Sequence, residues 1–215
     1  MNIRNSIFFI VILFYTLSCT GVDKNSEVDQ KINSALPIYC NKNFSANIDQ
    51  DTIYHTIPEW SFFNQDSELI SSADYLGKIY VVDFFFTTCP TICPKMTANM
   101  VFLQSISKDL DVDFLSFTVD PKKDSSETLK KYQQEYGALD HNWNFITGEQ
   151  YKIYDLGVNG FLVPNQEDAL APGGFLHSEK MILIDAKGRI RGMYNGTTKS
   201  EMNKIVADIN KLKNE

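Results

Sequence analysis

The sequence predicts a single α/β domain in which helices flank a β-sheet, and three observations carry this prediction. Strand-like and helix-like patterns alternate from Ile53 onward, as in domains whose helices cover a sheet. Residues 79–86 are almost all β-branched or aromatic, which is typical of a strand buried on both faces. The segment that follows repeats its apolar residues every three to four positions, so one helical face should pack on that sheet.

The first helix is expected directly after this strand, over 94–108. Pro94 suits the first turn, because the amide that proline lacks is unpaired at a helix start anyway. The apolar positions that should face the sheet are Met96, Met100, Leu103 and Ile106. A second strand is expected over 112–119 and should end at Asp120-Pro121, because proline donates no ladder hydrogen bond.

The later elements alternate in the same way. Ser125 or Ser126 should cap a helix that stops at Gly137. A short strand at 143–146 and a short helix at 150–157 follow.

The domain is expected to close with a hairpin and a helix. A loop at 172–174, Pro-Gly-Gly, precedes two strands, 180–185 and 190–194, joined by a tight turn. An amphipathic helix over 200–213 ends the domain.

Composition and charge exclude several classes of protein. A content of 43% hydrophobic and 22% charged residues fits neither a disordered chain nor a polytopic membrane protein. The 20 basic and 27 acidic residues give a net charge of −7 without a basic block, which argues against a nucleic acid partner. Four cysteines are too few for a disulfide scaffold, so each is interpreted by its position. A monomer is expected.

The N-terminus has the pattern of an export signal. Arg4 precedes an apolar run at 7–17, whose eleven residues fall short of the roughly 20 that span a bilayer. The run closes at Thr16-Leu17-Ser18-Cys19, which resembles a bacterial lipoprotein cleavage box, although the leucine stands two residues before the cysteine instead of three. We expect residues 1–19 to be a signal peptide with lipid attachment at Cys19. The alternative is an incidental cysteine in a plain signal peptide.

Either alternative places the mature chain outside the cytoplasm, on the periplasmic side, and lipidation would anchor it to the membrane. Residues 20–50 are polar and lack periodicity, so they are expected to form a tether, with the folded domain at 51–215. Cys40 lies in this tether without a cysteine nearby in sequence. It is interpreted as a spare thiol, with a regulatory or mixed-disulfide role as the alternative.

Cys89 and Cys93 lie between the buried strand and the helix start. Unpaired amides and the positive end of the helix dipole favour thiolates there. Each cysteine precedes a proline and is biased away from helical geometry, so 89–93 should form a loop over the helix end. A structural disulfide would close only a five-residue loop and gain little stability. Because neither cysteine is expected to fill the core, serine substitutions should cost little stability.

Three segments in fixed order carry a family resemblance: DFFFTTCPTICPKMTANM at 83–100, SFTVDPKKDSSETLKKY at 116–132 and HSEKMILIDAKGRIRGMYNGT at 177–197. Together they resemble the SCO/SenC family over most of 53–213. The resemblance implies a thioredoxin-like fold and delivery of copper to the dinuclear copper centre of a respiratory cytochrome c oxidase, whose copper-receiving subunit would be the partner. The metal ligands of that family match Cys89, Cys93 and His177 here.

The chemistry of these residues agrees with the resemblance. Two thiolates and an imidazole form a soft ligand set that suits Cu(I) and, with a water or a fourth donor, Cu(II). Structural zinc would ordinarily need four protein ligands, and no fourth is apparent near these motifs. Copper is therefore the expected metal.

A thiol:disulfide reductase that keeps oxidase cysteines reduced is the competing hypothesis. It would use Cys89 and Cys93 as a redox pair and would not need His177. The three-residue gap between the cysteines, and His177-Ser178 at the place where thioredoxin-like reductases carry a cis-proline, favour the metal. A peroxidase would need a reactive cysteine in a different motif.

Four other polar residues need an interpretation. His55 and His141 match no motif and are expected at the surface. Asp120 matches the aspartate of the family's V-D-P motif and is expected either to hydrogen-bond a ligand or help dock a partner, or simply to hold a turn. Asp83 lies inside the buried strand, so it needs either a hydrogen-bond partner or exposure to solvent.

Overall fold

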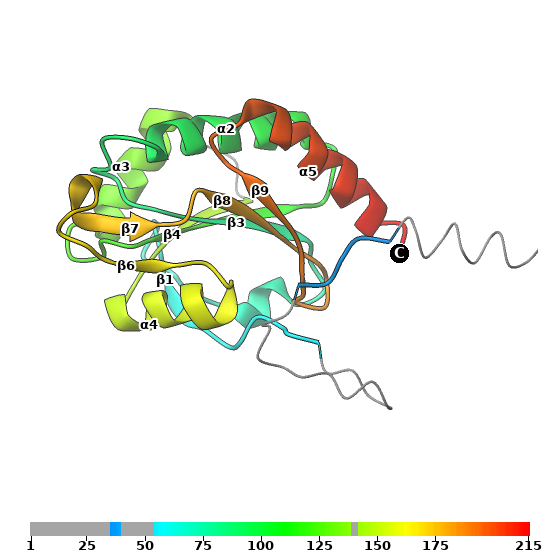
Figure 1. The fold of residues 1–215 in the computed structure, drawn as a ribbon, viewed down its shortest axis with the longest axis horizontal. Helices are drawn as coiled ribbons and strands as arrows, with labels where there is room; N and C mark the ends of the chain where they lie inside the picture. Colours follow the sequence, from blue (N-terminus) through cyan, green and yellow to red (C-terminus); the bar gives the residue numbers. More distant parts are fainter. Residues whose placement is uncertain (1–34, 40–53, 139–141) are drawn as a thin grey trace, which may run out of the picture. The chain divides into compact units, whose positions relative to one another are not determined.

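The centre of the fold is a seven-stranded sheet. Its strands are β1 (Ser61–Asn64), β2 (Leu69–Ser71), β3 (Tyr80–Phe85), β4 (Asp113–Thr118), β5 (Trp143–Thr147), β8 (Lys180–Ile184) and β9 (Ile190–Asn195). They lie in the order β2-β1-β5-β4-β3-β8-β9 (Figure 1). β3, β4 and β5 run parallel, and the outer strands pair antiparallel. The computed structural model describes residues 35–39, 54–138 and 142–215.

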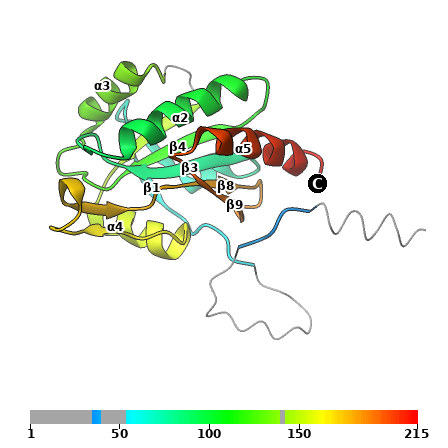
Figure 2. The ribbon, with the colours of Figure 1, turned by 45° about the horizontal axis from the view of Figure 1, so that its top comes forward.

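Helices cover both faces of this sheet. On one face lie α2 (Cys93–Ile106), α3 (Ser126–Tyr136) and α5 (Lys199–Leu212) (Figures 1 and 2). On the other lies α4 (Gln150–Asp155), which continues into a π-helical turn, η2 (Leu156–Gly160). A small second sheet of β6 (Asn165–Glu167) and β7 (Phe175–His177) lies on the same side as α4. Two short 3-10 turns, η1 (Ser72–Tyr75) and η3 (Pro172–Gly174), complete the described elements.

Most of the predicted elements are confirmed within one or two residues. The side chain of Ser125 accepts a hydrogen bond from the Thr128 amide and caps α3, and Gly137 ends that helix in the left-handed conformation at φ 71°. α2 buries Met96, Met100 and Leu103 as expected, but the prediction for Ile106 was wrong. Ile106 is the last helical residue and its side chain is 36% exposed, because the face that packs on the sheet ends one turn earlier.

Four short strands, β1, β2, β6 and β7, are not among the elements predicted from sequence. They are three or four residues long, too short to show a periodic pattern. β6 and β7 matter for function, because β7 ends at His177.

Asp83 has a hydrogen-bond partner, which confirms the first of the two alternatives for this residue. Its side chain is 1% exposed, and the Ser116 hydroxyl donates to its Oδ1 at 2.6 Å. The indole N–H of Trp143 in turn donates to the Ser116 oxygen at 3.0 Å. Burial raises the pKa of Asp83 from its ordinary 3.8 to about 6, although the Ser116 bond opposes this.

The substitution Asp83→Asn is therefore expected to change how stability depends on pH. Because the pKa of Asp83 is higher in the folded than in the unfolded state, the protonated carboxyl stabilises the fold at low pH. This contribution is lost as the pH rises from about 4 through about 6. The loss is on the order of 3 kcal/mol. Asparagine keeps the acceptor for Ser116 without the charge, so the variant should be more stable than the unmodified protein near pH 7 and similar near pH 4.

Urea unfolding at both pH values measures this difference. The exposed Asp109→Asn variant is the control. A variant that is less stable than the unmodified protein at neutral pH would contradict the prediction.

Part of the expected tether belongs to the folded unit. The sequence predicts an unstructured segment over 20–50, but Leu36 packs against the hydrophobic core. The guanidinium of Arg191 donates to the carbonyls of Leu36 at 2.9 Å and Pro37 at 3.1 Å. The prediction of an unstructured tether is therefore wrong for Leu36 and Pro37, which contact the folded domain.

Arg191 is itself held by two carboxylates. It is 3% exposed and pairs with Asp185 at 3.0 Å and Glu215 at 2.7 Å. A buried guanidinium needs such partners, because burial of an unpaired charge is costly. The predicted lipidation site Cys19, together with Cys40 and His141, lies outside the described residues. In the part of the chain that is described, no helix has both the length and the apolar character to cross a membrane.

Candidate metal centre

The two cysteines occupy the junction between β3 and α2. Cys89 lies in the turn after the strand, where its amide donates to the Phe86 carbonyl at 3.2 Å. Cys93 is the first residue of α2. Both are free thiols, 6% and 0% exposed respectively. The expectation that neither cysteine fills the core is therefore wrong, most clearly for Cys93, because the helix begins at this residue and directs its side chain inward.

His177 reaches the same place from the small sheet. It is 8% exposed, and its ring lies edge-on to Phe86 with a centroid separation of 5.6 Å. Its Nδ1 lies 3.1 Å from the Ser178 carbonyl oxygen, which accepts a hydrogen bond when that nitrogen carries the proton. A backbone acceptor at one ring nitrogen leaves the other free as a ligand. Nε2 is thereby directed at the two sulfurs.

These three side chains converge although they are far apart in sequence. The His177 Nε2 is 3.2 Å from the Cys93 sulfur and 3.9 Å from the Cys89 sulfur. All three ligand atoms lie within 4.8 Å of one another. Among the described residues, this is the one group of three or more cysteine, histidine or acidic side chains with ligand atoms so close together.

The two thiols differ in their electrostatics. A hydrogen bond from the Cys93 thiol, aided by His177, lowers the pKa of Cys89 well below its ordinary value, although burial acts in the opposite direction. Burial raises the pKa of Cys93, and the charge on Cys89 raises it further. These opposite shifts favour the thiolate at Cys89 over the thiolate at Cys93. A thiolate is both a metal ligand and a nucleophile, so this pair is suited to either chemistry.

The donor set fits a soft metal ion. Two sulfurs and an imidazole nitrogen match the preference of Cu(I), and three protein ligands leave a position free for a fourth donor. Among the described residues no fourth cysteine, histidine or acidic side chain joins this group, whereas a closed structural zinc site has four protein ligands.

Asp120 is found at the end of β4, close to a second aspartate. It is 2% exposed, its amide donates to the Thr118 hydroxyl oxygen at 3.0 Å, and its Oδ2 lies 3.2 Å from Lys123 Nζ. In the described structure it makes no hydrogen bond to the two cysteines or to His177. A role beside the ligands stays a prediction for Asp120.

Asp124 is a polar residue of this region that sequence reasoning missed. It is fully buried and accepts hydrogen bonds from the amide and hydroxyl of Thr87 and from the hydroxyl of Thr118. Burial raises its pKa, and these bonds oppose the rise. Asp124 lies in the segment at 116–132 that carries the family resemblance, but only Asp120 was selected there as a candidate.

His55 is not a free surface residue, which corrects the sequence prediction. It is half-buried, and its Nε2 lies at hydrogen-bond distance, 2.6 Å, from the Gly160 carbonyl in η2. This contact joins the segment before β1 to the π-helical turn. His55 does not belong to the group of metal ligands, so we interpret its contact with Gly160 as part of the fold.

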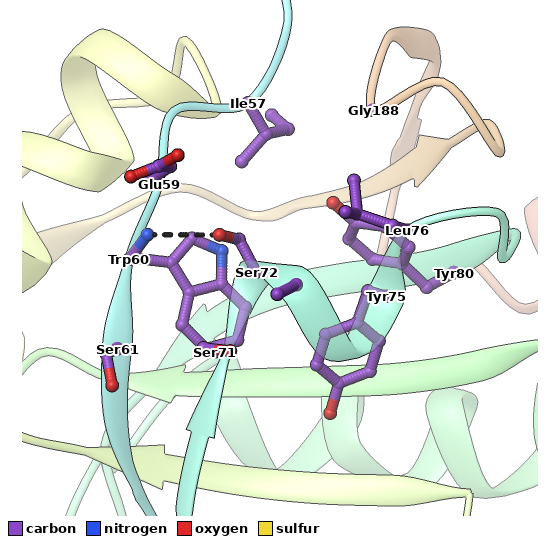
Figure 3. Close-up of a pocket in the computed structure, with 11 residues that line it drawn as sticks. Ile57, Glu59, Trp60, Ser61, Ser71, Ser72, Tyr75, Leu76, Tyr80 and Gly188 are labelled. Carbon is purple, nitrogen blue, oxygen red and sulfur yellow. Dashed lines mark hydrogen bonds between the residues drawn. The ribbon is translucent and has the colours of Figure 1, made fainter.

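A cavity of about 580 Å³ lies on another part of the sheet (Figure 3). Its lining includes Trp60, Tyr75 and Tyr80, and the first two rings stack with centroids 5.8 Å apart. Tyr80 begins β3, whereas Cys89 follows the end of that strand. None of the three candidate ligands lines this cavity, so it is separate from the metal centre.

Two buried thiols and an imidazole at the end of a central parallel strand define a soft-metal site on a mixed α/β domain. The SCO1/SenC family model matches residues 48–214. The chain belongs to this family.

Individual relatives support the same assignment. The SCO1 protein homolog of Bacillus subtilis is 32% identical over 167 residues, which cover 74% of this chain and 84% of the relative. The crystal structure of a SCO1/SenC family lipoprotein from Bacillus anthracis superposes with a TM-score of 0.70 at 34% identity, covering 74% of this chain and 95% of that one.

A third match is BsSco, described as having a disulfide switch and as a member of the Sco family of cytochrome c oxidase assembly proteins. It has a TM-score of 0.67 at 31% identity and covers 76% of this chain and 96% of its own. These matches confirm the predicted thioredoxin-like fold.

Proposed function

We propose that this protein binds copper through Cys89, Cys93 and His177 and delivers it to the dinuclear copper centre of a respiratory cytochrome c oxidase. The observation that carries the proposal is the convergence of His177 with the two thiols, since His177 is 84 residues from Cys93 in sequence. A redox pair alone would not need an imidazole nitrogen directed at both sulfurs. The partner would be the copper-receiving subunit of the oxidase, approached by a monomer of this chain.

Two further observations support this function. The ligand set is soft, and the lowered pKa of Cys89 favours the thiolate form that copper binds. Among relatives, BsSco is named as an oxidase assembly protein, and yeast Sco1 has been solved with copper bound.

Titration of the reduced, purified protein with Cu(I) and with Cu(II) tests the proposal. One equivalent of copper is expected to bind, and the Cu(II) form should show a sulfur-to-copper charge-transfer band. Failure of the fully reduced protein to bind either oxidation state would overturn the copper function.

The opposite pKa shifts of Cys89 and Cys93 favour a second candidate function, thiol:disulfide reduction. The Cys89 thiolate would attack a substrate disulfide and form a mixed disulfide. The Cys93 thiol would then lose its proton and displace the reduced substrate, leaving a Cys89–Cys93 disulfide. Reduction of a model disulfide by a protein that binds no copper would establish this function in place of the first.

The proposal also places the protein outside the cytoplasm, on the periplasmic side, with a lipid anchor at Cys19. The Cys19→Ser variant is expected to leave the membrane fraction or to retain its signal peptide, because the apolar run before it is shorter than a spanning helix. Its copper affinity should be unchanged. Cell fractionation measures the first effect, and a normally processed variant that stays in the membrane would contradict the assignment.

A further inference from the structure

A buried carboxylate holds the loop that carries Cys89. The Asp124 Oδ2 accepts the Thr87 amide N–H at 3.0 Å, and its Oδ1 accepts the Thr87 hydroxyl at 2.5 Å. Asp124 is fully buried, so water does not compete for these bonds. Two bonds from one residue fix both the position and the orientation of Thr87.

Thr87 connects this carboxylate to the metal site. It follows β3 and precedes Cys89 by two residues. The Cys89 amide turns back to the Phe86 carbonyl at 3.2 Å. The short segment that ends at Cys89 is therefore held by its own turn and by Asp124.

Asp124 is itself held by contacts with the end of β4, so its position does not depend on the loop that carries Cys89. Its Oδ2 accepts the Thr118 hydroxyl from β4 at 2.5 Å, and its amide donates to the Asp120 carbonyl at 2.9 Å. The carboxylate thus joins the loop after β3 to the end of β4, the neighbouring parallel strand.

We propose that Asp124 is a positioning residue for the metal site, and that it holds the Cys89 sulfur within reach of an ion bound by Cys93 and His177. Cys93 is held by α2 and His177 by β7, whereas Cys89 lies in a turn. Its place among the ligands therefore depends on the contacts of its loop. This inference rests on the proposed copper function.

Substitutions at both ends of the Asp124–Thr87 contact test the role. Asparagine at position 124 replaces one acceptor oxygen by an N–H group, so Asp124→Asn should weaken copper binding about 10- to 100-fold, as loss of outer-shell partners does at other metal sites. It should also shift the charge-transfer band. Thr87→Val removes one hydroxyl and should shift the band in the same direction, whereas Thr87→Ser keeps the hydroxyl and should restore the original spectrum.

Thr118→Val is the matched control, because it removes a hydroxyl bond to the same carboxylate from the side of β4. Thr118→Val also removes the acceptor of the Asp120 amide. We therefore expect a loss of stability at least as large as that of Thr87→Val but an unchanged band, since both Thr87 bonds remain. Equal band shifts in Thr87→Val and Thr118→Val would overturn the positioning role. So would unchanged spectra and affinities in Asp124→Asn and Thr87→Val while the unmodified protein binds copper.

A copper-free measurement separates this inference from the proposed function. Hydrogen exchange at the Cys89 amide should be faster in Thr87→Val than in Thr118→Val, because only the first frees the cysteine loop. If the unmodified protein binds no copper, the copper function fails, and this exchange rate still decides whether Asp124 holds the loop. Equal exchange rates in the two variants would overturn the inference.

Discussion

The Cys93→Ala protein is expected to bind no copper at concentrations that saturate the unmodified protein. Cys93 supplies the sulfur nearest to His177, at 3.2 Å from Nε2, and its removal leaves one thiolate and one imidazole. One thiolate with one imidazole is a weaker site for a soft ion than two thiolates, and other thiols compete with it for copper. Copper bound per protein after gel filtration, measured by elemental analysis, gives the result directly.

The buried position of Cys93 decides which substitution to use. Serine would place a hydroxyl where the thiol lies in the core, and this group could still hydrogen-bond the His177 Nε2, so alanine removes the donor at position 93 more completely. Alanine leaves a small cavity, which costs about 1 kcal/mol by comparison with loss of a methylene group. Cys40→Ser is the control and should keep one equivalent of copper. Full copper occupancy in folded Cys93→Ala would exclude the proposed site.

The His177→Ala protein is expected to separate copper binding from thiol chemistry. The substitution removes one of three ligands but leaves both thiols and the start of α2 in place. Copper should bind more weakly with an altered spectrum, and oxidase maturation in cells should be lost. Reduction of a model disulfide should be largely retained, because a thiolate and a thiol remain.

Oxidase copper content in cells that carry His177→Ala is the deciding measurement. If it equals that of unmodified cells while Cys93→Ala abolishes it, the copper-delivery function fails and the reductase function stands. The neighbouring Ser178→Ala variant serves as a control, because Nδ1 of His177 contacts the backbone carbonyl of that residue, which alanine retains.

The long elements could be predicted because each has a strong local signal. The apolar run of β3 and the spacing of Met202, Ile205 and Ile209 in α5 are visible in the sequence, and all these side chains are buried. β1 shows why short strands could not be found. Phe62 is buried but the adjacent Phe63 is 50% exposed, so two successive phenylalanines hide the alternation.

The candidate site was predictable in its ligands but not in their surroundings. Cys89, Cys93 and His177 follow from the motifs, whereas no local pattern shows that Cys93 points into the core. The contact of Asp124 with Thr87 joins residues 37 positions apart across two loops. Such a contact depends on the register of β3 beside β4, which a single sequence does not reveal.

The Arg191 ion pairs also determine how mechanical load would pass through the domain. A pull on the chain at Leu36 would act first on Arg191, near the start of β9, and through it on Asp185 and Glu215. The other end of β9, at Asn195, is four residues or about 13 Å away, and it contacts Glu179 in the segment that follows His177. Tension would therefore act on the Arg191 ion pairs and on the length of β9 before it reached the segment that follows His177.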